Sequence, residues 1–259
     1  MLTIIGIGLS DEKDITVKGL EIIKKSDAVY LENYTSILNV PVGKLEKFYN
    51  KKIILADRKM VEQDAEKTML RDAQTKNVSF LVAGDALSAT THIDMIKRAK
   101  DLGIKVNIVH NASVLTAVGE TGLQLYKFGK TTSIPFPEKN FRPETAYDVI
   151  KENLKNNLHT LVLLDLRPQE NKFMAIDEAI DILLKIENKR KENVFTEKTR
   201  IIGCARIGSD DEKIIYGPAE KLGKIDFGKP AHCLIVPGKL HFAEEDFLKF
   251  FSIKQQKNI

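Results

Sequence analysis

The stretch SFLVAGDALSATTHIDMIKRAKDLGIKVNIVH, residues 79–110, decides the fold class of this chain. It begins and ends with short apolar runs, at 79–82 and 106–110. Uninterrupted apolar runs of this length are typical of strands that are buried on both faces. Between them, the segment 91–102 has its apolar residues at helical spacing, and Gly103 follows as a stop signal. The stretch therefore predicts a strand, a helix and a second strand.

The same alternation continues along the whole chain and predicts an α/β fold with a mostly parallel sheet. Consecutive strands around 200–216 predict a mixed sheet in the second half. Strands are expected at 2–6, 28–32, 52–55, 79–82, 106–110, 131–135, 160–165, 200–205, 213–216 and 233–236, and helices at 16–25, 91–102, 144–156, 174–186 and 243–251. The expected division is an N-terminal α/β domain at 1–112, a C-terminal α/β domain at 113–251 and a frayed tail at 252–259.

Composition agrees with a globular protein of two smaller α/β domains. The chain has 259 residues, 43% of them hydrophobic, and a formal net charge of +4. So small an excess of positive charge does not indicate nucleic-acid binding. The apolar start of the chain has no basic region before it, so it predicts a first strand and not a signal peptide. No run approaches a membrane span, and a cytoplasmic protein is expected.

Several familiar kinds of site are excluded by spacing. The two cysteines, Cys204 and Cys233, lie inside apolar runs and are expected to be buried and reduced. Without a CxxC pair or an HxxxH spacing, no metal site is predicted. The chain also lacks the GxSxG sequence on which a serine hydrolase depends. No catalytic side chain is assigned from these patterns.

Small and polar residues follow several of the expected strands. Gly6 and Gly8 follow the first strand, where glycines allow close approach to the backbone, yet the third glycine of a dinucleotide-binding loop is missing. Asp85 follows Gly84 at the end of another strand, where its carboxylate either attracts a cationic ligand group or caps a helix. Ser113 has the same two interpretations. In open α/β sheets, ligands bind at the carboxyl edge where such turns gather.

Read in order, the segments of the chain resemble one family closely. The segments are GIGLSDEKDITVKGLE, YTSIL, ILADR, GDALSATTH, HNASV, AVGETGLQLYKFGKT, HTLVLLDL, ARIGS and HCLIVPGKLHFAEEDFL. Together they resemble the diphthine synthase family, within the tetrapyrrole-methylase-like methyltransferases. No single short motif decides the resemblance, which runs from Met1 to about Phe251.

The resemblance implies a two-domain homodimer that binds S-adenosylmethionine in a cleft between its domains and releases S-adenosylhomocysteine. It places the cofactor-binding positions at Leu9, Asp85, Ser88, Ser113, Val114, Leu164, Ile207 and His232. The chain departs from the family pattern at Ala86, where proline is common, and at Ser88, where an apolar or small residue is usual. These departures put the contacts at Ser88 in doubt.

The implied substrate is translation elongation factor 2, methylated on a modified histidine during diphthamide biosynthesis. Several segments, including GLQLY and HTLVLLDL, are closer to the eukaryotic form, which predicts a fourth methyl group and a methyl ester. The alternative is trimethylation only, giving diphthine. Two remoter alternatives are a methyltransferase for small tetrapyrroles and a cofactor-binding protein without catalysis. Phe128, Phe136 and Phe141, in segments that look like loops, are expected to contribute to a dimer interface.

Overall fold

The computed structural model describes residues 1–35, 37–88, 92–139 and 141–253. By internal contacts the chain divides into two units. Unit 1 contains Met1–Leu115, Arg167–Asn171 and Gly208–Asp210. Unit 2 contains Thr116–Leu166, Lys172–Ile207 and Asp211–Ile259. Each unit is built around its own five-stranded sheet, so each is described by itself.

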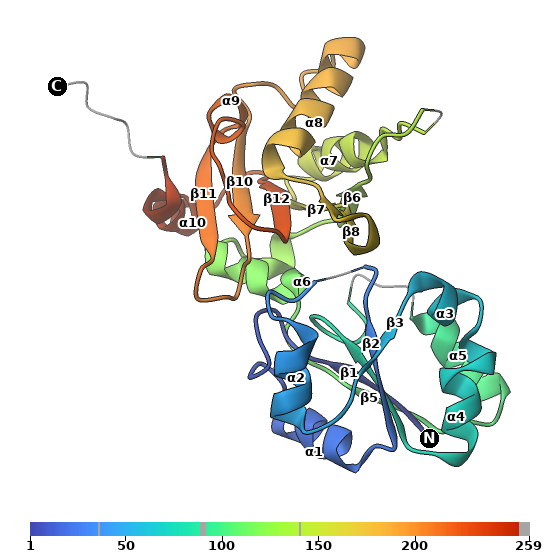
Figure 1. The fold of residues 1–259 in the computed structure, drawn as a ribbon. Helices are drawn as coiled ribbons and strands as arrows, with labels where there is room; N and C mark the ends of the chain where they lie inside the picture. The colour runs from blue at the N-terminus through green and yellow to red at the C-terminus, as the bar shows by residue number, and fades with distance from the viewer. Residues whose placement is uncertain (36, 89–91, 140, 254–259) are drawn as a thin grey trace. The chain divides into compact units, whose positions relative to one another are not determined.

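Unit 1 has an entirely parallel sheet with the strand order β3-β2-β4-β1-β5 (Figure 1). Its strands are β1 Leu2–Gly6, β2 Ala28–Glu32, β3 Ile54–Ala56, β4 Val78–Val82 and β5 Val106–Val109. Because β1 lies between β4 and β5, the loops that leave these three strands emerge side by side at one edge of the sheet. This arrangement positions the candidate site of unit 1.

Helices cover both faces of the parallel sheet. Side chains alternate along β1, so Leu2 and Ile4 enter one core while Ile5 enters the other. The first core includes α3 Arg58–Glu62, α4 Met69–Thr75 and α5 Ile93–Asp101; the second includes α1 Val17–Lys25 and α2 Val42–Tyr49. Full burial of one such aliphatic side chain stabilises the fold by about 1.5–3 kcal/mol. Burial on both faces explains the uninterrupted apolar runs.

Unit 2 has a mixed sheet, as expected, with the order β11-β10-β12-β7-β6. Only β6 and β7 are parallel; the other neighbours are antiparallel. The strands are β6 Thr132–Ile134, β7 Thr160–Leu164, β10 Arg200–Ala205, β11 Lys213–Pro218 and β12 His232–Val236, with a separate ribbon of β8 Leu166–Arg167 and β9 Lys172–Phe173. The helices are α6 Val114–Ala117, which begins in unit 1, α7 Thr145–Lys155, α8 Ile176–Arg190, α9 Ala219–Leu222 and α10 Phe242–Leu248. Short 3₁₀ helices lie at Ala65–Lys67, Val118–Thr121, Leu125–Lys127, Pro168–Glu170 and Lys249–Phe251.

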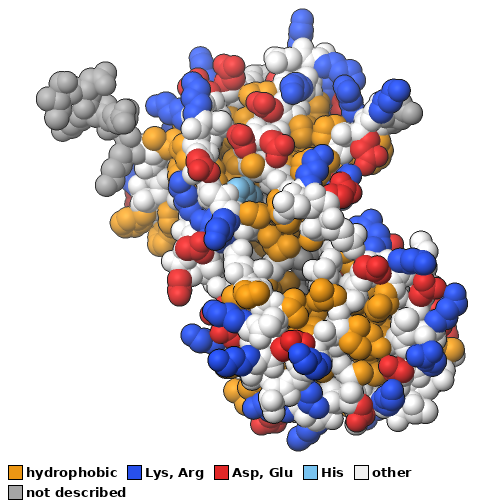
Figure 2. Space-filling model, viewed as in Figure 1, with side chains coloured by type: hydrophobic (Ala, Val, Ile, Leu, Met, Phe, Trp, Pro, Cys, Tyr) orange, Lys and Arg blue, Asp and Glu red, His pale blue; other side chains and the backbone are white. Residues whose placement is uncertain are grey.

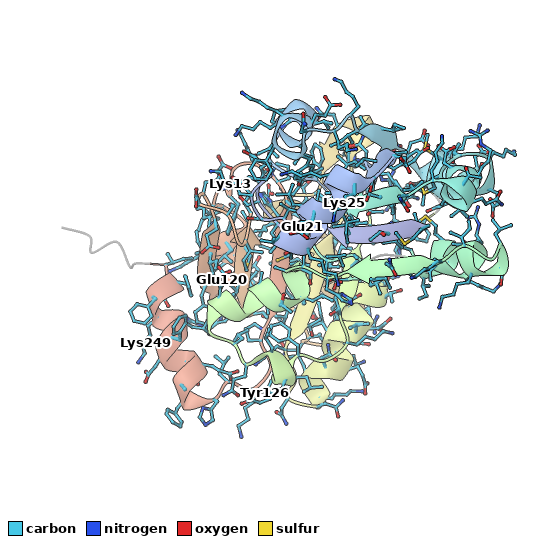
Figure 3. The ribbon with its side chains drawn as sticks, turned by 90° about the horizontal axis from the view of Figure 1, so that it is seen from below. Lys13, Glu21, Lys25, Glu120, Tyr126 and Lys249 are labelled. Carbon is cyan, nitrogen blue, oxygen red and sulfur yellow. The ribbon has the colours of Figure 1, made fainter. Side chains whose placement is uncertain are left out.

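Most expected elements are confirmed, with differences at their ends. Thr16 caps α1, because its side chain accepts a hydrogen bond from the Gly19 amide. The polar face of α1 carries exposed Glu21 and Lys25 (Figure 3). Val17, the first residue of α1, is 76% exposed.

Other expectations need correction or fall outside the described residues. Ser252 and Ile253 were expected to fray, but the Ile253 amide donates to the carbonyl of Tyr216 on β11, and the Ile253 side chain packs against the core of unit 2. Residues 254–259 lie outside the described residues, as do positions 89–91 at the expected start of a helix. Cys204 and Cys233 are free and buried, as expected.

A buried histidine predicts that unit 1 loses stability in mild acid. His92 is 2% exposed and packs edge-on against Phe80, and burial lowers its pKa from 6.5 to about 4. The unfolded chain therefore binds a proton that the folded chain excludes, so stability is present above pH 6.5 and is lost as pH falls. Between pH 7 and pH 5 the expected loss is about 2 kcal/mol. Urea unfolding at pH 7 and pH 5 measures this loss of stability. The variant His92→Phe should show a smaller difference in free energy of unfolding between the two pH values. If the unsubstituted protein is equally stable at both, His92 is not the cause of an acid-dependent loss.

Candidate functional site

Two glycine-containing loops pair at the carboxyl edge of the unit 1 sheet. The Gly8 amide donates to the Gly84 carbonyl at 3.2 Å, and the Gly84 amide donates to the Gly8 carbonyl at 2.6 Å. Both residues have positive φ angles, +85° and +77°. A Cβ atom on Gly6 would lie 2.6 Å from the Gly84 carbonyl oxygen. The glycines therefore allow one loop to approach the other, and the close approach expected of a ligand is here made by the chain itself.

Asp85 is held at this edge by donors from three sides. Its Oδ1 accepts from the Leu87 amide at 3.0 Å and from the Ser88 hydroxyl at 3.2 Å. Its Oδ2 lies 2.8 Å from Nδ1 of His110 and accepts from the Asn111 amide at 3.0 Å. Burial opposes ionisation, yet these hydrogen bonds lower the pKa of Asp85 overall. The side chain is an ionised carboxylate whose acceptor positions are largely taken by its own chain.

The loop after β1 is shaped by a second aspartate. Oδ2 of Asp14 accepts from the amides of Leu9 at 3.0 Å and Ser10 at 2.7 Å. Asp14 does not cap α1, because Thr16 has that role. Asp14 instead fixes the backbone at Leu9, one of the expected cofactor positions. Neither this role nor that of Asn111, whose side chain reaches Gly6, follows from the sequence pattern.

The expected cofactor positions of unit 1 lie on these loops. Leu9 and Ser88 are half-buried, whereas Ser113 is buried. The Ser88 hydroxyl is directed at Asp85, so the departure from the family pattern is accommodated inside the loop. Ser113 Oγ accepts from the Leu115 amide at 3.2 Å, which is the capping geometry, and Val114 begins the four-residue helix α6. The structure thus gathers all five residues of this set, including Asp85, on neighbouring loops.

The expected positions of unit 2 gather at one edge of its sheet. Leu164 ends β7, Ile207 follows the end of β10, and His232 begins β12. Because β12 is antiparallel to both of the other strands, its start lies beside their ends. Ala205 is the direct cross-strand partner of His232. All three expected side chains are less than one-tenth exposed.

One ring nitrogen of His232 has no hydrogen-bond partner among the described residues. Its Nε2 lies 2.9 Å from the Lys229 carbonyl oxygen and therefore carries the hydrogen. Burial is the main cause that lowers the pKa of His232, so the ring is neutral. Nδ1 is then a buried acceptor, and it has no hydrogen-bond partner among the described residues. A buried acceptor of this kind is costly unless a ligand supplies the donor.

Comparison with known proteins identifies the family. Residues 1–223 match the model of the Tetrapyrrole (Corrin/Porphyrin) Methylases. The chain is 49% identical to diphthine synthase of Methanocaldococcus jannaschii over 96% of this chain and 98% of the relative. It is 45% identical to diphthine methyl ester synthase of Dictyostelium discoideum over 98% and 99%.

The chain belongs to the diphthine synthase family. A crystal structure of a protein assigned as a diphthine synthase from Entamoeba histolytica has the same fold, with a TM-score of 0.91 and 46% identity over 98% of this chain and 99% of that one. Membership makes the chain an S-adenosylmethionine-dependent methyltransferase. It also confirms the expected α/β class, with one parallel and one mixed sheet.

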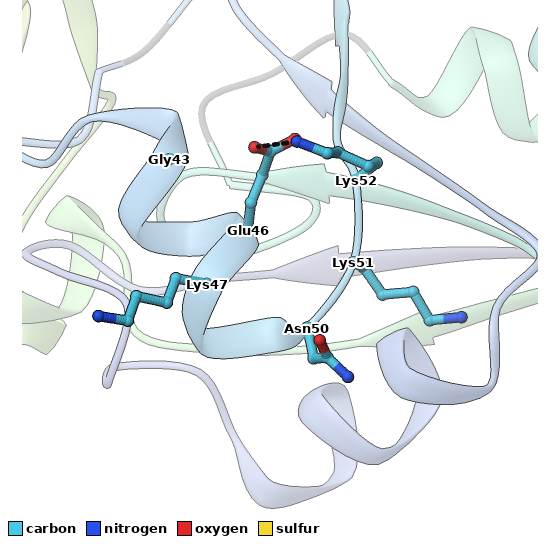
Figure 4. Close-up of a pocket in the computed structure, with 6 residues that line it drawn as sticks. All are labelled: Gly43, Glu46, Lys47, Asn50, Lys51 and Lys52. Carbon is cyan, nitrogen blue, oxygen red and sulfur yellow. Dashed lines mark hydrogen bonds and ion pairs between the residues drawn. The ribbon is translucent and has the colours of Figure 1, made fainter.

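Unit 1 of this diphthine synthase family member also has a polar hollow away from the candidate site. It has a volume of about 400 Å³ and lies along α2 (Figure 4), lined by Gly43, Glu46, Lys47, Asn50, Lys51 and Lys52. Three of its charged side chains have partners, because Lys52 Nζ lies 3.3 Å from Glu46 and Lys51 Nζ donates to the Ser26 carbonyl. These are surface contacts, and no functional role is assigned to them.

The described part of the chain contains neither a metal-binding cluster nor a membrane-spanning helix. No group of three or more His, Cys, Asp or Glu side chains there is arranged to hold a metal ion. Among the same residues, no helix is long and apolar enough to cross a bilayer.

Proposed function

We propose that this chain transfers methyl groups from S-adenosylmethionine to the modified histidine of elongation factor 2 during diphthamide biosynthesis. The acceptor is the amino group of a 3-amino-3-carboxypropyl substituent. The observation that carries the proposal is identity of 45–49%, over nearly the whole chain, to relatives named diphthine synthase and diphthine methyl ester synthase. Methylation of elongation factor 2 carrying this precursor tests it directly.

Groups at the edges of both sheets are suited to bind S-adenosylmethionine. In unit 1, neighbouring loops after β1, β4 and β5 are fixed by Asp14 and Asp85, which leaves an ordered backbone surface around Leu9. In unit 2, the unpartnered Nδ1 of His232 needs a donor, and the cofactor has hydroxyl and amino donors. The idea that one cofactor molecule uses both sets of residues stays a prediction.

Methyl transfer from a sulfonium to an amine does not require a strong general acid or base from the protein. When bound, S-adenosylmethionine supplies a methyl group on a sulfonium, which already contains its leaving group. The α-amino group of a peptide has a pKa of about 7.7–8.0, and the carboxylate beside the acceptor amine raises its pKa above that value, so a small part of the amine is neutral near pH 7 without a general base. The side chains of this protein then serve to orient the two reactants and exclude water. No catalytic residue is therefore named.

His232→Phe tests the unit 2 part of this site. The variant keeps an aromatic ring but removes Nδ1, so the affinity for S-adenosylhomocysteine should fall about five- to tenfold, the loss of roughly one hydrogen bond. Calorimetric titration measures the dissociation constant. His241→Phe, a change at the exposed N-cap residue of α10, is the matched control and should bind normally. Equal affinities of a folded His232→Phe and the unsubstituted protein would remove His232 from the site.

We also propose that the end product is the methyl ester, made by a fourth transfer to the carboxylate. Relatives named for either product are similarly identical to this chain, so overall identity does not favour one of them. The support is the set of segments closer to the eukaryotic form. With excess S-adenosylmethionine, a fourth methyl group that mild base removes is the expected result; a product that stops at three methyl groups is diphthine.

We also propose that the protein is a homodimer and is located in the cytoplasm. The expected role of Phe136 needs correction, because this residue is 4% exposed and packs in the core of unit 2. Phe141 is 53% exposed, and apolar side chains gather over α10 and the 3₁₀ helix that follows it (Figure 2), where Phe242 and Phe250 are 72% and 82% exposed. Exposed apolar patches support association. Light scattering at micromolar concentration should give twice the chain mass; the monomer mass would exclude the dimer.

A further inference from the structure

One residue, Asn111, joins the three loops at the carboxyl edge of the unit 1 sheet through its side chain and its backbone amide. Nδ2 of Asn111 donates to the carbonyl of Gly6 and to the carbonyl of Asp14, both at 3.0 Å. Its Oδ1 accepts from the Ala112 amide at 2.8 Å. Its backbone amide donates to Oδ2 of Asp85. Asn111, which follows β5, thus contacts the loop after β1 and the loop after β4.

The primary amide of asparagine suits this position for a chemical reason. Its nitrogen carries two hydrogens that point in different directions, and its oxygen is an acceptor. Both hydrogens reach carbonyl groups that lie 97 and 105 residues away in the sequence, so the loops are held at fixed positions. An aspartate of the same shape has no hydrogen to donate when ionised, and an alanine makes none of the side-chain bonds.

The hydrogen bond from Asn111 to Asp14 also connects Asn111 to Leu9, an expected cofactor position. The Asp14 carboxylate accepts from the Leu9 and Ser10 amides, while its carbonyl accepts from Asn111. A shift of Asn111 therefore moves the backbone on which Leu9 lies. At the other side, the Asn111 amide and the ring of His110 hold the same oxygen of Asp85.

We infer that Asn111 is a positioning residue for the cofactor. It acts through Leu9 and Asp85 and does not touch the reacting atoms. The inference rests on the proposed function, since it assumes that these loops bind S-adenosylmethionine. The inference predicts a selective effect on the cofactor. Asn111 variants should bind S-adenosylmethionine more weakly but have an unchanged KM for elongation factor 2.

The test compares Asn111→Asp and Asn111→Ala with the unsubstituted protein. Both variants should raise the dissociation constant and the KM for S-adenosylmethionine about tenfold. The KM for elongation factor 2 should stay within about twofold, because Asn111 acts on the loops that position Leu9 and Asp85. Asn107→Ala is the matched control, because Asn107 lies on β5 and, among the described residues, its side-chain amide donates only to the Met1 sulfur. Circular dichroism verifies the fold of each variant.

Each outcome decides the inference. Tenfold weaker cofactor binding with an unchanged KM for elongation factor 2 supports it. Unchanged cofactor affinity in folded variants overturns it, and so does loss of the fold in both variants, because Asn111 would then determine the fold and not the site. Failure of the unsubstituted protein to bind S-adenosylmethionine is a separate result, which rejects the proposed function itself.

Discussion

Gly6→Ala is expected to weaken S-adenosylmethionine binding about 100-fold, the equivalent of about 3 kcal/mol of overpacking. The new Cβ would lie 2.6 Å from the Gly84 carbonyl oxygen and 2.9 Å from the Ala86 nitrogen. These are backbone atoms, so no side chain can rotate to make room. The loops after β1 and β4 must separate, which breaks the paired amides of Gly8 and Gly84 and displaces Asp85.

The matched control is Gly43→Ala, because a Cβ there meets nothing within 4 Å. Gly43 lies in α2, where alanine should add about 0.5–1 kcal/mol of stability and leave binding unchanged. Calorimetry measures cofactor affinity, and thermal unfolding shows which variants are folded. A folded Gly6→Ala with normal affinity would show that the paired loops do not form part of the cofactor site.

Glu244→Ala is expected to lower the free energy of unfolding by about 3–5 kcal/mol, the usual effect of removing one partner from a buried ion pair. Glu244 is 1% exposed. Its carboxylate pairs with Lys127 and accepts from His159 Nε2 at 3.1 Å and from the amides of Gln124 and His241 at 3.0 and 2.7 Å. Burial opposes ionisation, but these donors lower the pKa of Glu244 to about 2.

The neighbouring Glu245→Ala provides the control for this effect. Glu245 lies on the same helix but is exposed, so its replacement should change stability by less than about 0.5 kcal/mol. Chemical unfolding of both variants at pH 7 gives the comparison. If the two substitutions cost the same, the buried cluster around Glu244 does not stabilise unit 2.

The strands of the two large sheets could be predicted from the sequence, whereas the short ribbon of β8 and β9 and several helices could not. β1 and β4 are buried on both faces, so every position is apolar or small and the run is unmistakable. Helix α2 has Pro41 at its N-cap with no side-chain hydrogen bond, so the usual start signal is missing. Helices α3 and α4 have only five and seven residues, too few to show a period of 3.6.

The loops of the candidate site could be predicted from the sequence, but the contacts that shape them could not. Gly6, Gly8 and Asp85 lie at the carboxyl edge of the unit 1 sheet, and their close contacts are with other parts of the chain. Asn111 shows the limit most clearly. Its bonds to Gly6 and Asp14 join residues about a hundred positions apart, and no local pattern predicts such contacts. The activity itself follows from the ordered resemblance of whole segments.

The most direct measurement of the central claim is mass spectrometry of the histidine peptide of elongation factor 2. The factor, carrying the unmethylated 3-amino-3-carboxypropyl histidine, is incubated with this protein and excess S-adenosylmethionine. The account predicts that methyl groups are added to this residue in succession, and that none is added when the cofactor is omitted. An unmodified peptide, in a reaction where calorimetry shows that the protein has bound S-adenosylmethionine, would contradict the account.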